Sequence, residues 1–142
     1  MSKARDLANF DDAWITWAPA LGTSWANGSG TWSASYKQTG KTVHVQAQFT
    51  LATNSIPTGG ASGMSCSLPV AAKVGQFQGF VVYGSRGFVH VLTGSINGTT
   101  AFSIWASNVA GTYPTVALPS ATVPFTWAAG DQVSFSFTYE AA

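Results

Sequence analysis

Apolar and polar side chains alternate over ten positions of residues 41–51, KTVHVQAQFTL. Successive residues of a strand point to opposite faces, so the five apolar side chains share one face and the polar ones share the other. A helix would scatter both sets around its axis. The stretch therefore predicts a half-buried antiparallel strand.

The same alternation recurs along the rest of the chain. Residues 31–37, TWSASYK, predict the hairpin partner of this strand, with Gln38-Thr39-Gly40 as the turn. Asn97-Gly98 is the strongest hairpin signal, because a type I′ turn needs positive φ at both central positions. We expect a first edge strand in 13–21 that stops at Pro19, and a loop in 108–121. The other predicted strands are 64–68, 76–83, 88–96, 99–106 and 133–139.

The spacing of these segments predicts the fold class. Short strands recur about every ten residues, separated by Gly and Pro, and no segment has the pattern of a helix. We therefore expect an all-β fold: a two-sheet antiparallel sandwich, jelly-roll-like, formed by one domain of residues 13–142. Residues 1–12 hold five of the eleven charges and are interpreted as a short N-terminal arm. This arm is either a frayed terminus or a tether that packs on a neighbouring subunit.

Formal charge is scarce in this chain. Asp, Glu, Lys and Arg make up 8% of the residues, against about 25% in an average soluble domain. One interpretation is an extracellular β-protein that tolerates low charge. The other is a surface covered by identical subunits or by a larger particle, because interface cores are poor in charge and rich in aromatic rings.

The charge and hydropathy patterns also exclude several partners and compartments. The net charge is +1 without a basic cluster, which predicts no binding to nucleic acid or to an anionic membrane. The N-terminal residues lack the apolar core of a signal peptide, and no apolar run is long enough to cross a membrane. We expect synthesis in a cytoplasm.

Catalytic and metal-binding patterns are missing from the sequence. The acidic residues lie in the arm and near the C-terminus, and Asp131 fits a turn before the final strand. His44, His90 and Cys66 have no metal-ligand spacing, and Cys66 is expected to be a small buried hydrophobe. We predict a protein that is not an enzyme and has no catalytic residue, metal or cofactor.

Six tryptophans remain to be explained. About half of them are expected in the core, because burial of an indole removes a large apolar area from water. Trp25, in a loop, and Trp105, on a second apolar face, are the first candidates for stacking on sugar rings or filling a pocket in a neighbouring subunit.

Several short segments together resemble the small β-sandwich domains of tailed-bacteriophage structural proteins: decoration (cement) proteins of the capsid, tail-fibre tips and minor tail proteins. The segments, in this order along the chain, are SKARDLA (2–8), WAPAL (17–21), YKQTGKTV (36–43), LPV (68–70), WAAGD (127–131) and YE (139–140). The resemblance implies a jelly roll that forms a homotrimer in a virion, without a cofactor.

Within the virion, the short arm favours a capsid decoration protein that binds and stabilises the shell of major capsid protein. A tail-fibre tip would usually follow a long shaft. The alternative is a receptor-binding module of the tail that contacts host-surface glycans and the other tail proteins. The residues expected to contact a second subunit or the capsid are Leu7, Phe10, Trp14, Trp17, Trp25 and Trp105.

Overall fold

The structure is a computed structural model. It describes residues 13–22, 30–52, 64–73, 77–83, 89–96, 98–108, 111–113, 115–120 and 122–142. The predicted arm with Leu7 and Phe10, the loop that carries Trp25 and the turn at 84–87 lie outside these residues.

The described part of the chain consists of strands joined by turns and links. The strands are β1 (Ile15–Thr16), β2 (Gly30–Thr39), β3 (Thr42–Leu51), β4 (Met64–Ser67), β5 (Phe77–Tyr83), β6 (Val89–Ile96), β7 (Ala101–Asn108), β8 (Thr115–Ala117) and β9 (Gln132–Glu140). Every pair of neighbouring strands is antiparallel. The predicted all-β sandwich is confirmed.

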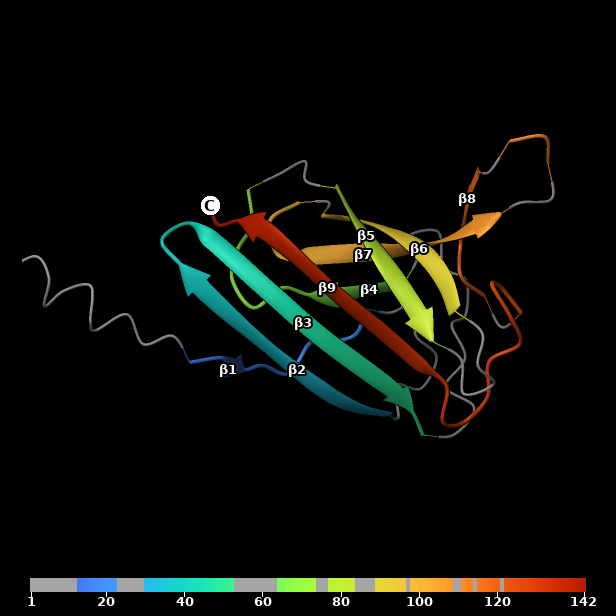
Figure 1. Ribbon diagram of the computed structural model, residues 1–142, viewed down its shortest axis with the longest axis horizontal. Helices are drawn as coiled ribbons and strands as arrows, with labels where there is room; N and C mark the ends of the chain where they lie inside the picture. The colour runs from blue at the N-terminus through green and yellow to red at the C-terminus, as the bar shows by residue number, and fades with distance from the viewer. Residues whose placement is uncertain are drawn as a thin grey trace, which may run out of the picture.

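The strands follow one hydrogen-bonded path, β1-β2-β3-β9-β5-β6-β7-β4, and β8 pairs with β7 beside it. We call β1, β2, β3 and β9 the front sheet and β4, β6 and β7 the back sheet. Figure 1 shows β2, β3 and β9 side by side, with β4 and β7 behind them. Because β5 pairs with both β9 and β6, it joins the two sheets.

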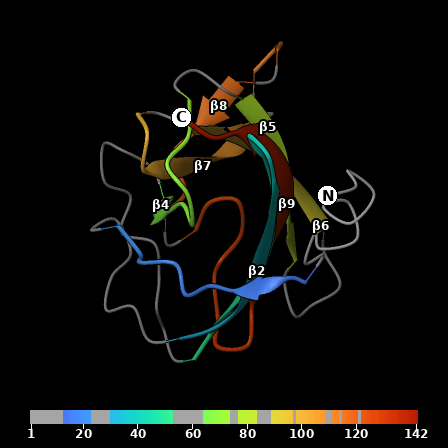
Figure 2. The same ribbon diagram turned by 90° about the vertical axis from the view of Figure 1, so that its left-hand side faces the viewer.

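The segment of residues 13–22 connects the two sheets on the opposite side. The Trp17 N–H donates to the Ala34 carbonyl of β2 at 3.0 Å, and farther along the Gly22 N–H donates to the Ser65 carbonyl of β4 at 2.8 Å. Figure 2 shows this blue segment leaving the front sheet and reaching toward β4. The expected edge strand is therefore only the two residues of β1, because the backbone leaves β2 after Trp17 to pair with the other sheet.

The core lies between the two sheets and follows the predicted alternation. On β3, Val43, Val45 and Phe49 are buried, and their partners on β9 are Tyr139, Phe137 and Val133. The Phe102 ring of β7 meets the rings of Phe135 and Phe137 on β9, at centroid distances of 4.7 Å and 5.2 Å. These edge-on contacts are a favoured geometry for aromatic pairs and join the back sheet to the front sheet.

The link of residues 68–73 closes one end of the sandwich. The Leu68 N–H donates to the Thr100 carbonyl at 2.8 Å and the Ala72 N–H to the Thr99 carbonyl at 2.7 Å. The hairpin predicted around Asn97-Gly98 is present, since β6 pairs antiparallel with β7, but its connection is longer than two residues because β6 ends at Ile96 and β7 begins at Ala101. Gly98 does adopt the positive φ, 85°, that the prediction required.

A buried tyrosine fastens the same link to the front sheet. The Tyr139 hydroxyl donates to the Val70 carbonyl at 2.7 Å and accepts from the Val70 N–H at 3.2 Å. Burial raises the pKa of Tyr139 to about 12, although the hydrogen bond with Val70 opposes this shift. The link is therefore held by side-chain as well as backbone bonds.

The structure confirms one and changes two of the remaining turn and loop predictions. The β2–β3 turn is Gly40-Lys41, with φ of 60° at Gly40, because β2 continues through Thr39. The predicted turn role of Asp131 is confirmed, since its buried carboxylate accepts from the Ala128 N–H at 2.6 Å. The predicted loop 108–121 contains the unpredicted strand β8, whose Ala117 pairs with Ala106 of β7.

Candidate functional site

The outer face of the front sheet is a continuous polar surface, which we call the front face. It is formed by alternate residues of three paired strands, which lie opposite one another in rows. Its members are Thr31, Ser33, Ser35, Lys37 and Thr39 of β2, Thr42, His44, Gln46, Gln48 and Thr50 of β3, and Gln132, Ser134, Ser136, Thr138 and Glu140 of β9. Only Lys37 and Glu140 among these fifteen residues carry a formal charge.

Side-chain hydrogen bonds connect neighbouring strands across this face. His44 Nδ1 and Thr138 Oγ1 are 2.8 Å apart, and Gln46 Nε2 donates to Ser35 Oγ at 3.3 Å. Gln48 Nε2 donates to Ser134 Oγ at 3.1 Å. These bonds hold the imidazole and amide groups in defined orientations while leaving each amide with further donor and acceptor capacity.

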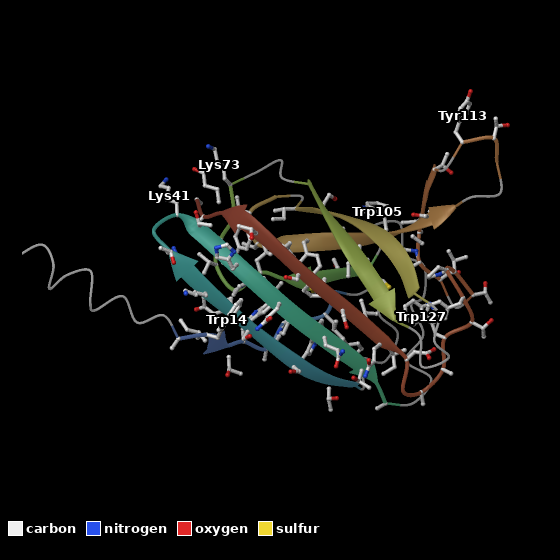
Figure 3. All side chains as sticks on the ribbon, viewed as in Figure 1. Trp14, Lys41, Lys73, Trp105, Tyr113 and Trp127 are labelled. Atoms are coloured by element: carbon white, nitrogen blue, oxygen red, sulfur yellow. The ribbon has the colours of Figure 1, made fainter. Side chains whose placement is uncertain are left out.

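The backbone register adds an indole ring to the front face. Ile15 pairs with Tyr36 and Thr16 with Ser35, and Ser35 belongs to the front face. Because side chains alternate along an extended chain, Trp14 lies on the same side as Thr16, one residue before the Ile15–Tyr36 pair. The Trp14 side chain is 47% exposed, and Figure 3 shows it at the β1 edge of the sheet.

Two other large apolar side chains are exposed in the described part of the chain. Ile15 is 51% exposed, next to Trp14 on β1, and Tyr113 is 78% exposed in the connection between β7 and β8. Figure 3 places Tyr113 at the opposite end of the long axis from Trp14. Exposed apolar side chains therefore occur at both ends of the molecule.

The other tryptophans in the described residues have intramolecular contacts. Trp17 packs against the core, and Trp127 is buried with its Nε1–H donating to the Val123 carbonyl at 3.2 Å. Trp32 lies 4.8 Å from the Phe49 ring. Trp105 is half-buried on the outer side of β7 and donates from Nε1 to Ser95 Oγ at 3.3 Å. Among the predicted contact residues that the structure describes, Trp14 is thus the exposed one.

A row of serine side chains lies on the outer face of the back sheet. Ser65 of β4, Ser103 of β7 and Ser95 of β6 form one row, because Ser103 pairs with both of the others. All three are half-buried, as is Trp105. This serine row offers shorter side chains than the Gln and His rows of the front face, and Trp105 and the exposed Ser107 lie on the same side of β7.

A shallow hollow of about 430 Å³ adjoins the front face at its β2–β3 turn end. It is lined by Lys41, Thr42, Thr138, Tyr139 and Glu140. Glu140 accepts an ion-pair contact from Lys73 Nζ at 3.3 Å. The hollow extends the polar surface beyond the row that contains His44.

The described acids and thiol have structural positions. Asp131 and Glu140 are on separate elements, and burial raises the pKa of the Cys66 thiol well above its ordinary value. Within the described ranges, no three His, Cys, Asp or Glu side chains lie close enough together to hold a metal ion. The same part of the chain has no helix able to span a membrane.

Comparison of the chain with protein-family models, with curated proteins and with solved structures gave no match. The front face must therefore be interpreted from its own chemistry. Sequence reasoning had placed the polar residues of β3 on one face, but it did not single out Ile15 or Tyr113, and it could not place Trp14 on the polar side. Alternation puts Trp14 and Thr16 on one side of the chain, but the β1–β2 register is what shows that this side is the polar one.

Proposed function

We propose that this protein is a non-enzymatic structural component of a bacteriophage virion, a trimeric decoration protein that binds the outside of the capsid. The observation that carries the proposal is Ile15, which is 51% exposed on β1 at the edge of the front sheet. An exposed apolar side chain at a sheet edge is a surface that a second subunit can cover.

The scarcity of charge supports the same function. Five charged side chains occur in the described residues, and Asp131 is the one that is buried in a turn. Lys73 and Glu140 form an ion pair, and Lys37 and Lys41 are the other two charged side chains in this part of the chain. A surface with so few charges loses little hydration energy when another protein covers it.

The protein would stabilise the particle by adding buried area. Burial of a side chain such as Ile15 contributes about 1.5–3 kcal/mol, and the contacts of one trimer would have to break before the capsid proteins beneath it could separate. Binding to the assembled shell therefore shifts its stability by mass action. Leu7, Phe10, Trp14, Trp17, Trp25 and Trp105 stay the predicted contact residues.

Quantitative mass spectrometry of purified virions tests the proposal. A decoration protein should be present in hundreds of copies per particle, and its complex in solution should have the mass of a trimer. A copy number of a few tens or fewer, matching the tail proteins, would replace the proposal with the alternative of a tail receptor-binding module.

A matched pair of variants sharpens this experiment. Ile15→Ser removes the apolar side chain at the edge, and Thr16→Ser removes only a methyl group from the neighbouring residue. We expect the first variant to reduce the copy number on the particle and the second to leave it unchanged. Equal copy numbers for both variants would show that the β1 edge does not contact the capsid.

A further inference from the structure

We propose that part of the front face is a binding site for a neutral saccharide. We call this site the Trp14 patch. It consists of Trp14 just before β1, Thr16 of β1, Ser35 and Lys37 on β2, His44 and Gln46 on β3, and Ser136 and Thr138 on β9. This inference concerns a different partner from the capsid, and the two partners would compete for Trp14, which is also a predicted contact residue.

The Trp14 ring supplies the apolar part of the site. The C–H groups on one side of a pyranose ring form a flat apolar surface, and an indole is the largest flat apolar side chain that a protein can place against it. Trp14 is 47% exposed, so its ring is accessible without a rearrangement of the fold. It precedes the Ile15–Tyr36 pair at the edge of the polar rows, where a sugar ring can rest on the indole and extend over β2 and β3.

The neighbouring polar groups supply hydrogen bonds for sugar hydroxyls. A hydroxyl is both a donor and an acceptor, and the Gln46 amide and the His44 imidazole offer both functions. Gln46 is oriented by its bond to Ser35 at 3.3 Å, and His44 by its contact with Thr138 at 2.8 Å. Because these protein groups are already oriented, their side chains lose less conformational entropy when a ligand binds.

The charge of the patch selects the kind of saccharide. Lys37 carries the single formal charge among its eight residues, so long-range attraction for an anionic polymer is weak. Neutral hydroxyl groups exchange hydrogen bonds with water for bonds with amides and hydroxyls without the cost of burying a charge. A neutral glycan is therefore the matching ligand.

The dimensions of the patch match several sugar units. The patch spans four neighbouring strands, β1, β2, β3 and β9. The three spacings of about 4.8 Å between them give a width of about 14 Å. The hollow lined by Thr42, Thr138 and Glu140 continues the surface beyond the His44 row. We infer that the ligand is a chain of linked sugars that crosses the strands.

Electrophoresis of the protein through gels that contain a soluble neutral glucan, mannan or galactan tests this site. We expect at least one of these polysaccharides to retard the protein, and the retardation to persist in about 0.5 M salt, where surface electrostatics are screened. Trp14→Ala should raise the apparent Kd about tenfold or more, equal to about 1.4 kcal/mol. Gln46→Ala should weaken binding by a smaller factor.

Tyr113→Ala is the matched control, because it removes an aromatic ring that is more exposed than Trp14 and lies at the other end of the molecule. It should bind like the wild type. Absence of retardation by all three neutral polysaccharides would overturn the inference. Retardation that is unchanged in the Trp14→Ala variant, or that occurs only with an anionic polysaccharide at low salt, would also overturn it. None of these results bears on the copy number in virions.

Discussion

The front and back sheets bury similar side chains but have different outer faces. On the front sheet, β2 and β3 are ten residues long and β9 is nine, and their outer rows carry Gln, His, Ser and Thr side chains. On the back sheet, β4 is four residues long and the row of Ser65, Ser95 and Ser103 is half-buried. Alternation therefore builds both inner faces, whereas the paired rows that contain exposed Gln46 and Ser136 belong to the front sheet.

The largest loss of stability is expected from a mutation in the contact between the two sheets. Phe102 is fully buried, and its ring is within 5.2 Å of both Phe135 and Phe137. Phe102→Ala should lower the free energy of unfolding by about 3–5 kcal/mol, because it leaves a cavity between the sheets. Urea denaturation followed by tryptophan fluorescence measures the loss. Phe102→Leu should cost less, and a loss below about 1 kcal/mol for the alanine variant would show that this ring does not hold the sheets together.

A smaller effect is expected at the end of the sandwich, where Tyr139 binds the link at Val70. Tyr139→Phe should lower stability by about 1–3 kcal/mol, because the partly buried N–H and C=O of Val70 lose their partner. The pKa of Tyr139 is raised to about 12 in the folded state, above the value of about 10 in an unfolded chain. The neutral phenol is thus favoured by folding, and its contribution is complete below pH 10 and is lost as the pH rises through 12.

Urea denaturation of wild type and Tyr139→Phe from pH 9 to 12 measures this contribution. The advantage of the wild type should shrink over the upper two units, since the variant has no phenol to ionise at this position. A constant difference across the series would contradict the assignment of the raised pKa to burial of Tyr139.

The smallest change is expected on the front face itself. Gln46 is exposed, and its bond to Ser35 is on the solvent side of the sheet. Gln46→Ala should change the free energy of unfolding by no more than about 0.5 kcal/mol, as is usual for surface positions. Ser35→Ala should behave alike in the same urea titration. A loss above about 1 kcal/mol in either variant would mean that the outer hydrogen bonds hold the sheet together, which would erase the contrast between its two faces.

Much of the front sheet was predictable because its information is local. The alternation in residues 42–51 places Val43 inward and His44 outward, and the same rule holds on β9. Cys66 and Asp131 were also predictable, since a lone thiol in an apolar segment and an Asp after a turn glycine each have one ordinary role.

The remaining features depend on partners distant in the sequence. Strand β8 contains only three residues and exists because β7 extends past β4 to pair with it. The segment 13–22 changes partners from Ala34 to Ser65, which no local pattern encodes. The position of Trp14 on the polar face follows only from the β1–β2 register, so the candidate site required the structure.

The place of β9 in the front sheet has a consequence for how the protein acquires its shape. Thr42 pairs with Glu140 and Thr50 with Gln132, so β3 can complete its pairing only with a strand that lies about 80–100 residues farther along the chain. The β2–β3 hairpin can form early, but its long open edge stays unsatisfied until residues 132–140 emerge from the ribosome. During that interval the nascent chain carries its greatest risk of aggregation, and a chaperone that shields β3 would have its largest effect there.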